Sequence, residues 1–194
     1  MNNSGLILIV SGPSGVGKGT ICSRLVDKYP DEYVLSISAT SRKPRGMEVD
    51  GREYFFKTKE EFEQMISDGM FLEYAQYVGN YYGTPLAWVK DKLDKDINVI
   101  LEIDVQGGLQ VKKKYPDAVT IFVVPPDKEE LIKRLGGRGT ENSKQIENRI
   151  KRASEEMKFA ESYDYVIINE IVENSVDLLH NITLSIKEKL SKEA

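Results

Sequence analysis

Cysteine, histidine and long apolar segments are scarce in this sequence, and each scarcity removes a class of protein from consideration. Among 194 residues there is one cysteine, Cys22, so no intrachain disulfide can form, which suits a reducing compartment. There is one histidine, His180, and no Cys/His cluster suggests a structural metal. We expect Cys22 to pack in the core and His180 to be a surface or packing residue.

Membrane-spanning and signal segments are also missing. The apolar run 6–10 is far shorter than the roughly 20 residues that cross a bilayer. The N-terminus lacks the basic start of a signal peptide. The net charge of −4 provides no general attraction to nucleic acid or to an anionic membrane. We therefore expect a cytoplasmic protein without membrane or nucleic-acid partners, which binds anions through local groups.

What the chain does contain is an alternation of short apolar segments with amphipathic helices. Continuous apolar runs of this length are typical of parallel strands that are buried on both faces. The predicted strands are 6–10, 97–105, 119–124 and 165–168. The predicted helices are 20–29, a helix capped by Asp127, and a C-terminal helix with Val176, Leu179, Ile182, Ile186 and Leu190 on one face. The alternation favours an α/β fold, with a parallel sheet and helices on both faces.

Two segments interrupt this alternation. Residues 38–88 are rich in tyrosine, glycine and turn residues, and predict a small strand-rich insert with one short helix near 59–67. Residues 136–158 begin with glycines and arginines and continue as a helix, which predicts a helical lid. We expect one domain at 5–184, in which these two parts are flaps over a core formed by 5–37, 89–135 and 159–194.

A phosphate-binding loop follows the first predicted strand. The loop reads Gly12-Pro13-Ser14-Gly15-Val16-Gly17-Lys18-Gly19-Thr20, which has the Walker A spacing of a P-loop NTPase. Its glycines allow backbone N–H groups to converge on phosphate oxygens, and the next helix presents its positive end to the same anion. Lys18 reaches the β- and γ-phosphates as a point charge. Gly19 stands where Ser or Thr is usual, so the Mg²⁺-binding hydroxyl is displaced to Thr20 or replaced by water.

Two acids lie near the end of the predicted strand 97–105. Glu102 and Asp104 are two residues apart, so on a strand they point to one face. Ligands of α/β sheets bind at the carboxyl ends of the strands, where an acid can hold Mg²⁺ through water. The alternative is a polar strand end that is solvated at the surface.

The chain as a whole resembles the guanylate kinases, a family of nucleoside monophosphate kinases. The resemblance covers roughly residues 6–190. Its motifs, in order, are Ser11-Gly12-Pro13-Ser14-Gly15-Val16-Gly17-Lys18, Ser38-Ala39-Thr40-Ser41-Arg42-Lys43-Pro44-Arg45, Gly51-Arg52-Glu53-Tyr54, Gly79-Asn80-Tyr81-Tyr82-Gly83-Thr84 and Arg138-Gly139-Thr140-Glu141. It implies transfer of the γ-phosphoryl group of ATP, with Mg²⁺, to GMP. The products are ADP and GDP, a reaction of purine nucleotide metabolism that recycles GMP and dGMP.

The resemblance also implies roles for individual residues. Arg42 and Arg45 would clamp the acceptor phosphate, because the planar arginine fork suits phosphate. Glu73 would read guanine, since one carboxylate can accept both N1–H and the exocyclic amine, whereas adenine has an acceptor at N1. Without the family, Glu73 is an anonymous acid at a helix end. The full set implied at the GMP site is Ser38, Arg42, Arg45, Tyr54, Glu73, Tyr82, Thr84, Glu102 and Asp104.

The lid side is implied to complete the donor site. Arg138 and Arg149 would neutralise charge on the phosphoryl group in flight, so with Lys18 and Asp104 they form the implied catalytic set. Arg134 and Asn169 would join the loop residues in binding ATP. Arg152 is equally well explained as part of a solvated helix face.

Two alternatives to a GMP kinase remain. Some domains of this type are protein-binding modules that use the groove for phosphopeptides. They have lost the ATP apparatus, however, whereas Lys18 and the loop glycines are intact here. The second alternative is a kinase for another nucleoside monophosphate, which the combination of Glu73 with Ser38 and Thr84 disfavours.

Overall fold

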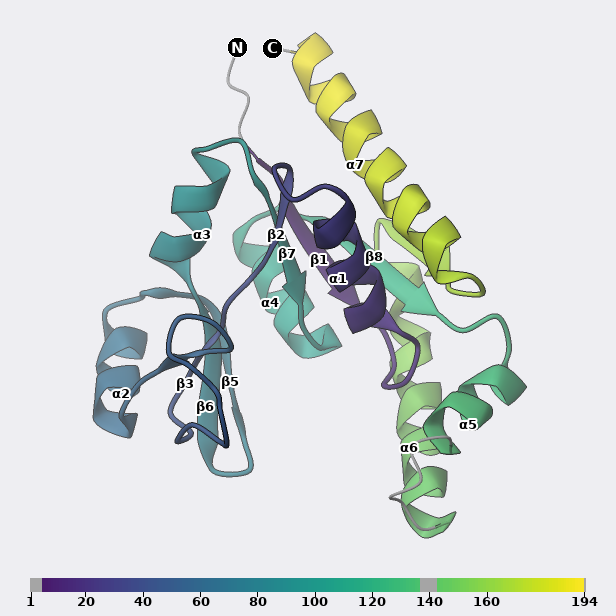
Figure 1. Cartoon of the computed structure of the whole chain (residues 1–194), viewed down its shortest axis with the longest axis horizontal. Helices are drawn as coiled ribbons and strands as arrows, with labels where there is room; N and C mark the ends of the chain where they lie inside the picture. The colour runs from purple at the N-terminus through teal and green to yellow at the C-terminus, as the bar shows by residue number, and fades with distance from the viewer. Residues whose placement is uncertain (1–4, 137–142, 194) are drawn as a thin grey trace.

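The computed structural model describes residues 5–136 and 143–193, and its centre is a parallel sheet (Figure 1). The strand order is β2-β7-β1-β8-β9, and every neighbouring pair is parallel. The strands are β1 (Ile7–Ser11), β2 (Tyr33–Leu35), β7 (Asn98–Glu102), β8 (Val119–Val124) and β9 (Tyr165–Ile168). The chain starts in the central strand β1, then forms β2 and β7 on one side of it, and afterwards β8 and β9 on the other. The sheet therefore has its topological switch point at β1, beside the place where α/β folds bind ligands.

Helices cover both faces of this sheet, as predicted. On one face α1 (Lys18–Lys28) and α7 (Val172–Glu193) pack on apolar side chains of β1, and the fully buried Cys22 belongs to this cluster. On the other face α3 (Leu86–Leu93) and α4 (Val105–Lys114) bury Val89 and Val111 against β1 and β7. His180 of α7 stacks on Tyr29, with ring centroids 3.9 Å apart, which is a packing role.

Residues 39–85 form a second, smaller sheet that lies to one side of the core (Figure 1). Its order is β4-β3-β6-β5, and it carries the helix α2. The elements are β3 (Ala39–Thr40), β4 (Phe55–Phe56), α2 (Lys59–Ser67), β5 (Phe71–Tyr77) and β6 (Asn80–Pro85). The insert has its own small core, in which the rings of Phe62 and Phe71 stack 4.3 Å apart. Thr58 and Glu61 form a capping box, which fixes where α2 begins.

The opposite side of the molecule carries α5 (Lys128–Gly136), α6 (Ser143–Glu156) and the 3₁₀ helix η1 (Met157–Ser162) (Figure 1). The predicted cap of α5 is confirmed, because Asp127 Oδ1 accepts the Glu130 N–H at 2.7 Å. Over residues 5–136 and 143–193, every helix is too short or too polar to cross a bilayer.

The structure corrects the prediction around the acids. The strand predicted at 97–105 is shorter, since β7 ends at Glu102 and α4 begins at Val105. Asp104 is therefore not a strand residue. It is the N-cap of α4, and its Oδ1 accepts the Gly107 N–H at 2.9 Å. The helix predicted at 20–29 starts two residues earlier, at Lys18, and the prediction lacked β2, α3 and α4.

Candidate active site

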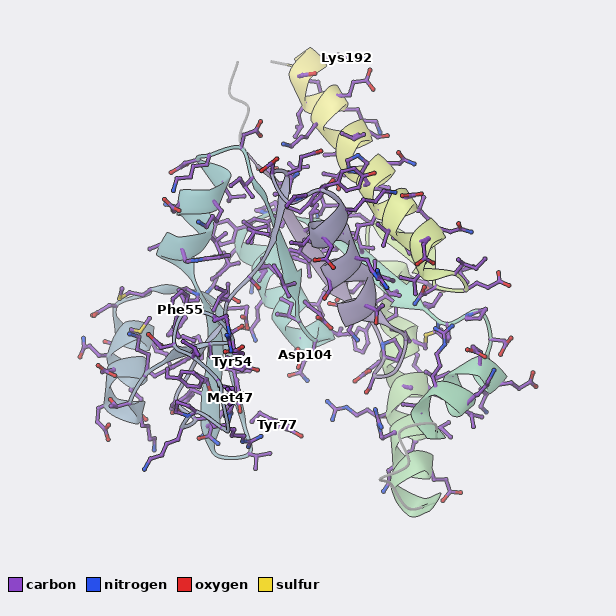
Figure 2. The ribbon with its side chains drawn as sticks, in the orientation of Figure 1. Met47, Tyr54, Phe55, Tyr77, Asp104 and Lys192 are labelled. Atoms are coloured by element: carbon purple, nitrogen blue, oxygen red, sulfur yellow. The ribbon has the colours of Figure 1, made fainter. Side chains whose placement is uncertain are left out.

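One cavity of about 710 Å³ lies between the core, the insert and α6. It brings together ten of the predicted residues from segments far apart in the sequence. These are Gly12, Ser14, Lys18, Ser38, Tyr54, Glu73, Tyr82, Glu102, Asp104 and Arg149. Figure 2 shows Tyr54 and Tyr77 on the insert and Asp104 at the end of α4 that faces it. The cavity is large enough for more than one small ligand group.

The phosphate-binding loop has a backbone that its glycines make possible. Gly12 has φ +144°, and a Cβ at this position would lie 2.2 Å from the Val123 carbonyl oxygen. Lys18 Nζ donates to the carbonyl oxygens of Gly12 (2.6 Å) and Pro13 (3.0 Å), so its charge is held over the loop. Burial lowers the pKa of Lys18, and the carboxylates of Glu102 and Glu156 oppose that shift.

Asn169 and Arg134, predicted beside ATP, contact the back of this loop. Asn169 is 1% exposed, and its Nδ2 donates to the Val16 carbonyl oxygen at 2.7 Å. The same nitrogen would lie 2.5 Å from a Cβ on Gly17, so the loop and the amide fit closely. The Oδ1 of Asn169 accepts from Ser175 Oγ at 3.0 Å. Arg134 pairs with Glu130 of its own helix at 2.8 Å, and its Nη1 reaches the Val16 carbonyl oxygen at 3.4 Å.

The remaining loop residues surround the start of α1. Pro13 is buried, Gly15 lies against Leu135, and Thr20 is exposed on the first turn of α1. Gly19 faces Glu102: a Cβ on Gly19 would be 3.3 Å from Glu102 Oε2 and 3.5 Å from Oε1. The carboxylate therefore lies next to the space that a serine or threonine side chain at residue 19 would enter.

Glu73 is a buried acid on the insert. It is 6% exposed, and its Oε1 accepts from Thr84 Oγ1 at 2.8 Å across the β5–β6 pair. Burial raises the pKa of Glu73, and the nearby Asp104 charge raises it further. A Cβ on Gly107 would lie 3.4 Å from Glu73 Oε2, so α4 also closes on this group. Ser38 lines the same cavity, whereas the predicted Thr84 is fully buried behind Glu73 and is not among the described residues that line it.

Arg42 and Arg45 are not among the described residues that line the cavity. Arg42 is 9% exposed and makes a two-point ion pair with Glu48, at 2.9 and 3.0 Å. Its guanidinium lies over the Tyr54 ring, 5.3 Å from the centroid, and the Tyr54 and Tyr82 rings meet edge to face. Arg45 is exposed. The cavity wall is thus formed by the two tyrosines, with Arg42 behind Tyr54.

The helix α6, in the segment predicted to be a lid, contributes an arginine and a further ion pair. Arg149 Nη2 donates to Ser14 Oγ of the loop at 2.6 Å. Arg152 and Glu156, paired at 3.1 Å, also line the cavity, and sequence reasoning did not assign either of them to the site. Their spacing from Arg149, three and seven residues on a helix, is a signal that could have identified them. The predicted Arg138 lies outside the described residues.

Comparisons with known proteins point to one family. A family model described as guanylate kinase matches residues 4–185. A curated guanylate kinase of Streptococcus thermophilus is 55% identical over 172 residues, covering 89% of this chain and 82% of the relative. One of Clostridium acetobutylicum is 48% identical over 192 residues, covering 99% and 91%. A solved guanylate kinase structure from Anaplasma phagocytophilum matches with a TM-score of 0.72 and 34% identity, covering 95% and 87%.

Guanylate kinases are ATP:GMP phosphotransferases. The match extends over nearly the whole chain and nearly the whole length of these relatives, and it includes both the phosphate-binding loop and the insert. The chain belongs to the guanylate kinase family.

Proposed function

We propose that this chain transfers the γ-phosphoryl group of MgATP to GMP, giving ADP and GDP, in one cavity shared by the two nucleotides. The observation that carries this proposal is that Lys18 of the loop and Glu73 of the insert line the same cavity. A lysine that holds donor phosphates and a carboxylate that can read a guanine edge thus face one space. Because the reaction is a direct transfer between bound nucleotides, positioning of this kind accounts for much of the catalysis.

The donor side is assigned to the loop and to α1. The backbone N–H groups of the loop 12–20, all but that of Pro13, which has none, and the N-terminal end of α1 would bind the ATP phosphates. Lys18 would leave its two carbonyl partners for the β- and γ-phosphates, which are stronger acceptors. Asn169 would support the loop from behind while bordering the ATP site with Arg134.

The residues around Gly19 fit a magnesium ion. Mg²⁺ prefers oxygen ligands and retains several waters. Two oxygen donors come from this region: the Glu102 carboxylate borders the space above Gly19, and Thr20, the next residue of α1, carries an exposed hydroxyl. We assign these two residues, directly or through water, to the ion. When bound, Mg²⁺ would neutralise charge on the donor phosphates.

The acceptor side is assigned to the insert. Glu73 would accept N1–H and the exocyclic amine of guanine, and its burial makes an unsatisfied partner there costly. Ser38 would donate to the guanine O6, and Thr84 would do so by turning its hydroxyl away from Glu73, with Asp104 beside the same pocket. Arg42, Arg45, Tyr54 and Tyr82 would bind the GMP phosphate.

The phosphoryl group in flight needs positive charge from the lid. Arg149 already reaches the loop at Ser14, so its guanidinium lies on the donor side of the cavity. Together with Arg138 it would stabilise charge on the equatorial oxygens. We retain the division into a core, a GMP-binding insert at 38–88 and a lid at 136–158, and we propose a cytoplasmic enzyme without nucleic-acid partners.

The test is ADP release from MgATP with GMP, AMP, CMP and UMP in separate coupled assays. We expect rapid turnover with GMP and little with the other three. Turnover that is fastest with another monophosphate would overturn the assignment of Glu73. Tight ATP binding without turnover of any of the four would favour a phosphopeptide-binding module.

A further inference from the structure

We propose that Glu48 is a positioning residue of the acceptor-phosphate site, which holds Arg42 and Arg45 in the arrangement that receives GMP. This inference rests on the proposed function, because it assumes that the two arginines bind the GMP phosphate. Sequence reasoning assigned no role to Glu48, and it does not line the cavity described above.

The first step is the pairing of Arg42 with Glu48. Nη1 of Arg42 donates to Glu48 Oε2 at 2.9 Å and Nη2 donates to Oε1 at 3.0 Å. The second N–H of Nη1 is used by the Lys43 carbonyl oxygen at 2.8 Å. A guanidinium has five N–H groups, so these three bonds, to Glu48 and to the Lys43 carbonyl oxygen, leave the Nε–H and one Nη2 N–H. Those two groups lie on one edge of the fork and can bind a phosphate with two parallel hydrogen bonds.

The plane of the guanidinium is fixed as well. Arg42 lies over the rings of Tyr54 and Phe56, 5.3 and 5.9 Å from the centroids. The hydrogen bonds to Glu48 raise the pKa of Arg42. Since Tyr54 lines the cavity, the guanidinium is held against the cavity wall. A side chain held in this way loses little further entropy when a ligand binds.

The second step links Glu48 to Arg45. Glu48 Oε2 also accepts the backbone N–H of Arg45 at 2.7 Å. In return, the Glu48 N–H donates to the Arg45 carbonyl oxygen at 3.1 Å, which closes a turn over residues 45–48. Gly46 within this turn has φ +54°, a conformation that glycine adopts without strain. One carboxylate therefore fixes the side chain of Arg42 and the backbone that carries Arg45.

The charge of Glu48 is needed for this role. The Arg42 guanidinium holds the pKa of the Glu48 carboxyl below its usual range, so the pair is ionised at neutral pH. Removing one member of a largely buried ion pair leaves the other charge poorly compensated. Without Glu48, Arg42 is expected to leave its place behind Tyr54, and its free edge would no longer be presented to a phosphate.

The experiment compares GMP with guanosine, which lacks the phosphate, by calorimetric binding to the full chain. We expect Glu48→Gln to weaken GMP binding by about tenfold or more, because one well-oriented charged contact to the phosphate is lost. Guanosine binding should change by less than about twofold, because guanosine has no phosphate. In the steady state, KM for GMP should rise with a much smaller change in kcat. In a variant that already carries Arg42→Lys, Glu48→Gln should have little further effect on GMP binding, because Glu48 acts through Arg42.

Glu53→Gln is the matched control. Glu53 lies in the same segment and also accepts a backbone N–H, from Val49 at 2.7 Å, and an arginine, Arg52, at 2.6 Å. Because Arg52 is not assigned to the phosphate site, we expect any loss in this variant to be shared equally by GMP and guanosine. If Glu48→Gln does not fold, Glu48→Asp retains the charge but shortens the reach, and should weaken GMP binding severalfold.

Three results would overturn the inference. GMP binding unchanged in Glu48→Gln, or in Glu48→Asp where that variant is used, would show that Glu48 does not position the arginines. Tighter GMP binding would show that Glu48 competes with the phosphate for Arg42. Equal losses of affinity for GMP and guanosine would indicate that Glu48 supports the fold of the insert in general and does not position the arginines. Failure of the wild-type chain to turn over GMP would instead reject the proposed function, so the two failures are distinguishable.

Discussion

At the scale of single residues, Glu73 combines a functional benefit with a cost in stability. Burial raises its pKa, so the folded chain holds the proton more tightly than the unfolded chain does. Between the lower unfolded pKa and the raised folded pKa, wild-type stability therefore falls as the pH rises. The proposed recognition of guanine uses the ionised form of Glu73, so GMP affinity should fall as the pH decreases through the raised pKa.

Glu73→Gln should reverse both properties. It retains an oxygen that can accept from Thr84 but cannot accept both guanine donors, so KM for GMP should rise by about tenfold or more. Its midpoint of thermal unfolding should exceed that of the wild type at pH 7, with the difference disappearing in acid. Glu63→Gln, at an exposed position of α2, serves as the control. Unchanged GMP turnover in Glu73→Gln would contradict the account of base recognition.

Glu102 allows a second test at this scale, on magnesium. If its carboxylate compensates for the missing hydroxyl at Gly19, Glu102→Gln should raise the Mg²⁺ concentration that half-saturates ADP binding. We expect the half-saturating Mg²⁺ concentration to rise by about threefold to tenfold, because the substitution weakens one ligand or one water-mediated contact to the ion. The measurement is fluorescent ADP binding at varied Mg²⁺, with Glu129→Gln on exposed α5 as control. An unchanged Mg²⁺ dependence would remove Glu102 from the ion site.

How far these residues could be predicted depends on the range of their interactions. The phosphate-binding loop is local, since a strand, a glycine-rich turn and a helix are consecutive in the sequence, and its composition indicates its chemistry. Glu73 is different, because its burial depends on Thr84 and on α4, which are distant in the sequence. Motif resemblance, rather than residue pattern, pointed to it. Glu48 was missed because it acts through Arg42.

At the scale of elements, α7 supports the phosphate-binding loop through a short chain of hydrogen bonds. Ser175 of α7 donates to Asn169 Oδ1 at 3.0 Å, and Asn169 Nδ2 donates to the Val16 carbonyl oxygen at 2.7 Å. Ser175 and Asn169 are both almost fully buried. The orientation of the Asn169 amide, and through it the loop, should depend on the serine hydroxyl.

Ser175→Ala should therefore affect both stability and ATP binding. Loss of the hydroxyl leaves the buried Asn169 Oδ1 without this donor, which should lower the free energy of unfolding by about 1–3 kcal/mol. KM for ATP should rise more than KM for GMP, because Val16 belongs to the donor loop. Urea unfolding and steady-state kinetics measure the two effects. Ser191→Ala, on the exposed end of α7, is the control, and equal effects in both variants would argue against a specific link.

Elements were predictable where one residue pattern decided them. Residues 119–124 and 165–168 form β8 and β9 as predicted, and α2 covers the predicted 59–67. The helix α4 was missed because it contains adjacent glycines, each about 1 kcal/mol unfavourable relative to alanine in a helix. The structure shows why they are there. A Cβ on Gly107 would meet Glu73 and Asp104, and one on Gly108 would lie 2.9 Å from the Tyr163 hydroxyl.

At the scale of the whole molecule, the cavity is formed by three parts that meet at one edge of the sheet. The insert and the α5–α6 side lie on opposite sides of the core in Figure 1, and the cavity has walls from all three. Phosphoryl transfer requires exclusion of water, which would otherwise accept the phosphoryl group. We therefore expect the two flanking parts to approach each other when both nucleotide sites are filled.

Small-angle X-ray scattering tests this expectation with a bisubstrate ligand, in which adenosine and guanosine are joined through their 5′ positions by a chain of phosphates. Its two ends occupy the donor and acceptor sites together, so it should draw the insert and the lid over one phosphate chain. The radius of gyration should fall toward the roughly 16 Å expected for a compact domain of this length. ADP or GMP alone should produce a smaller decrease in the radius of gyration, because each occupies only one of the two nucleotide sites. A radius unchanged at stoichiometric binding would mean that the described arrangement is already the one that performs the transfer.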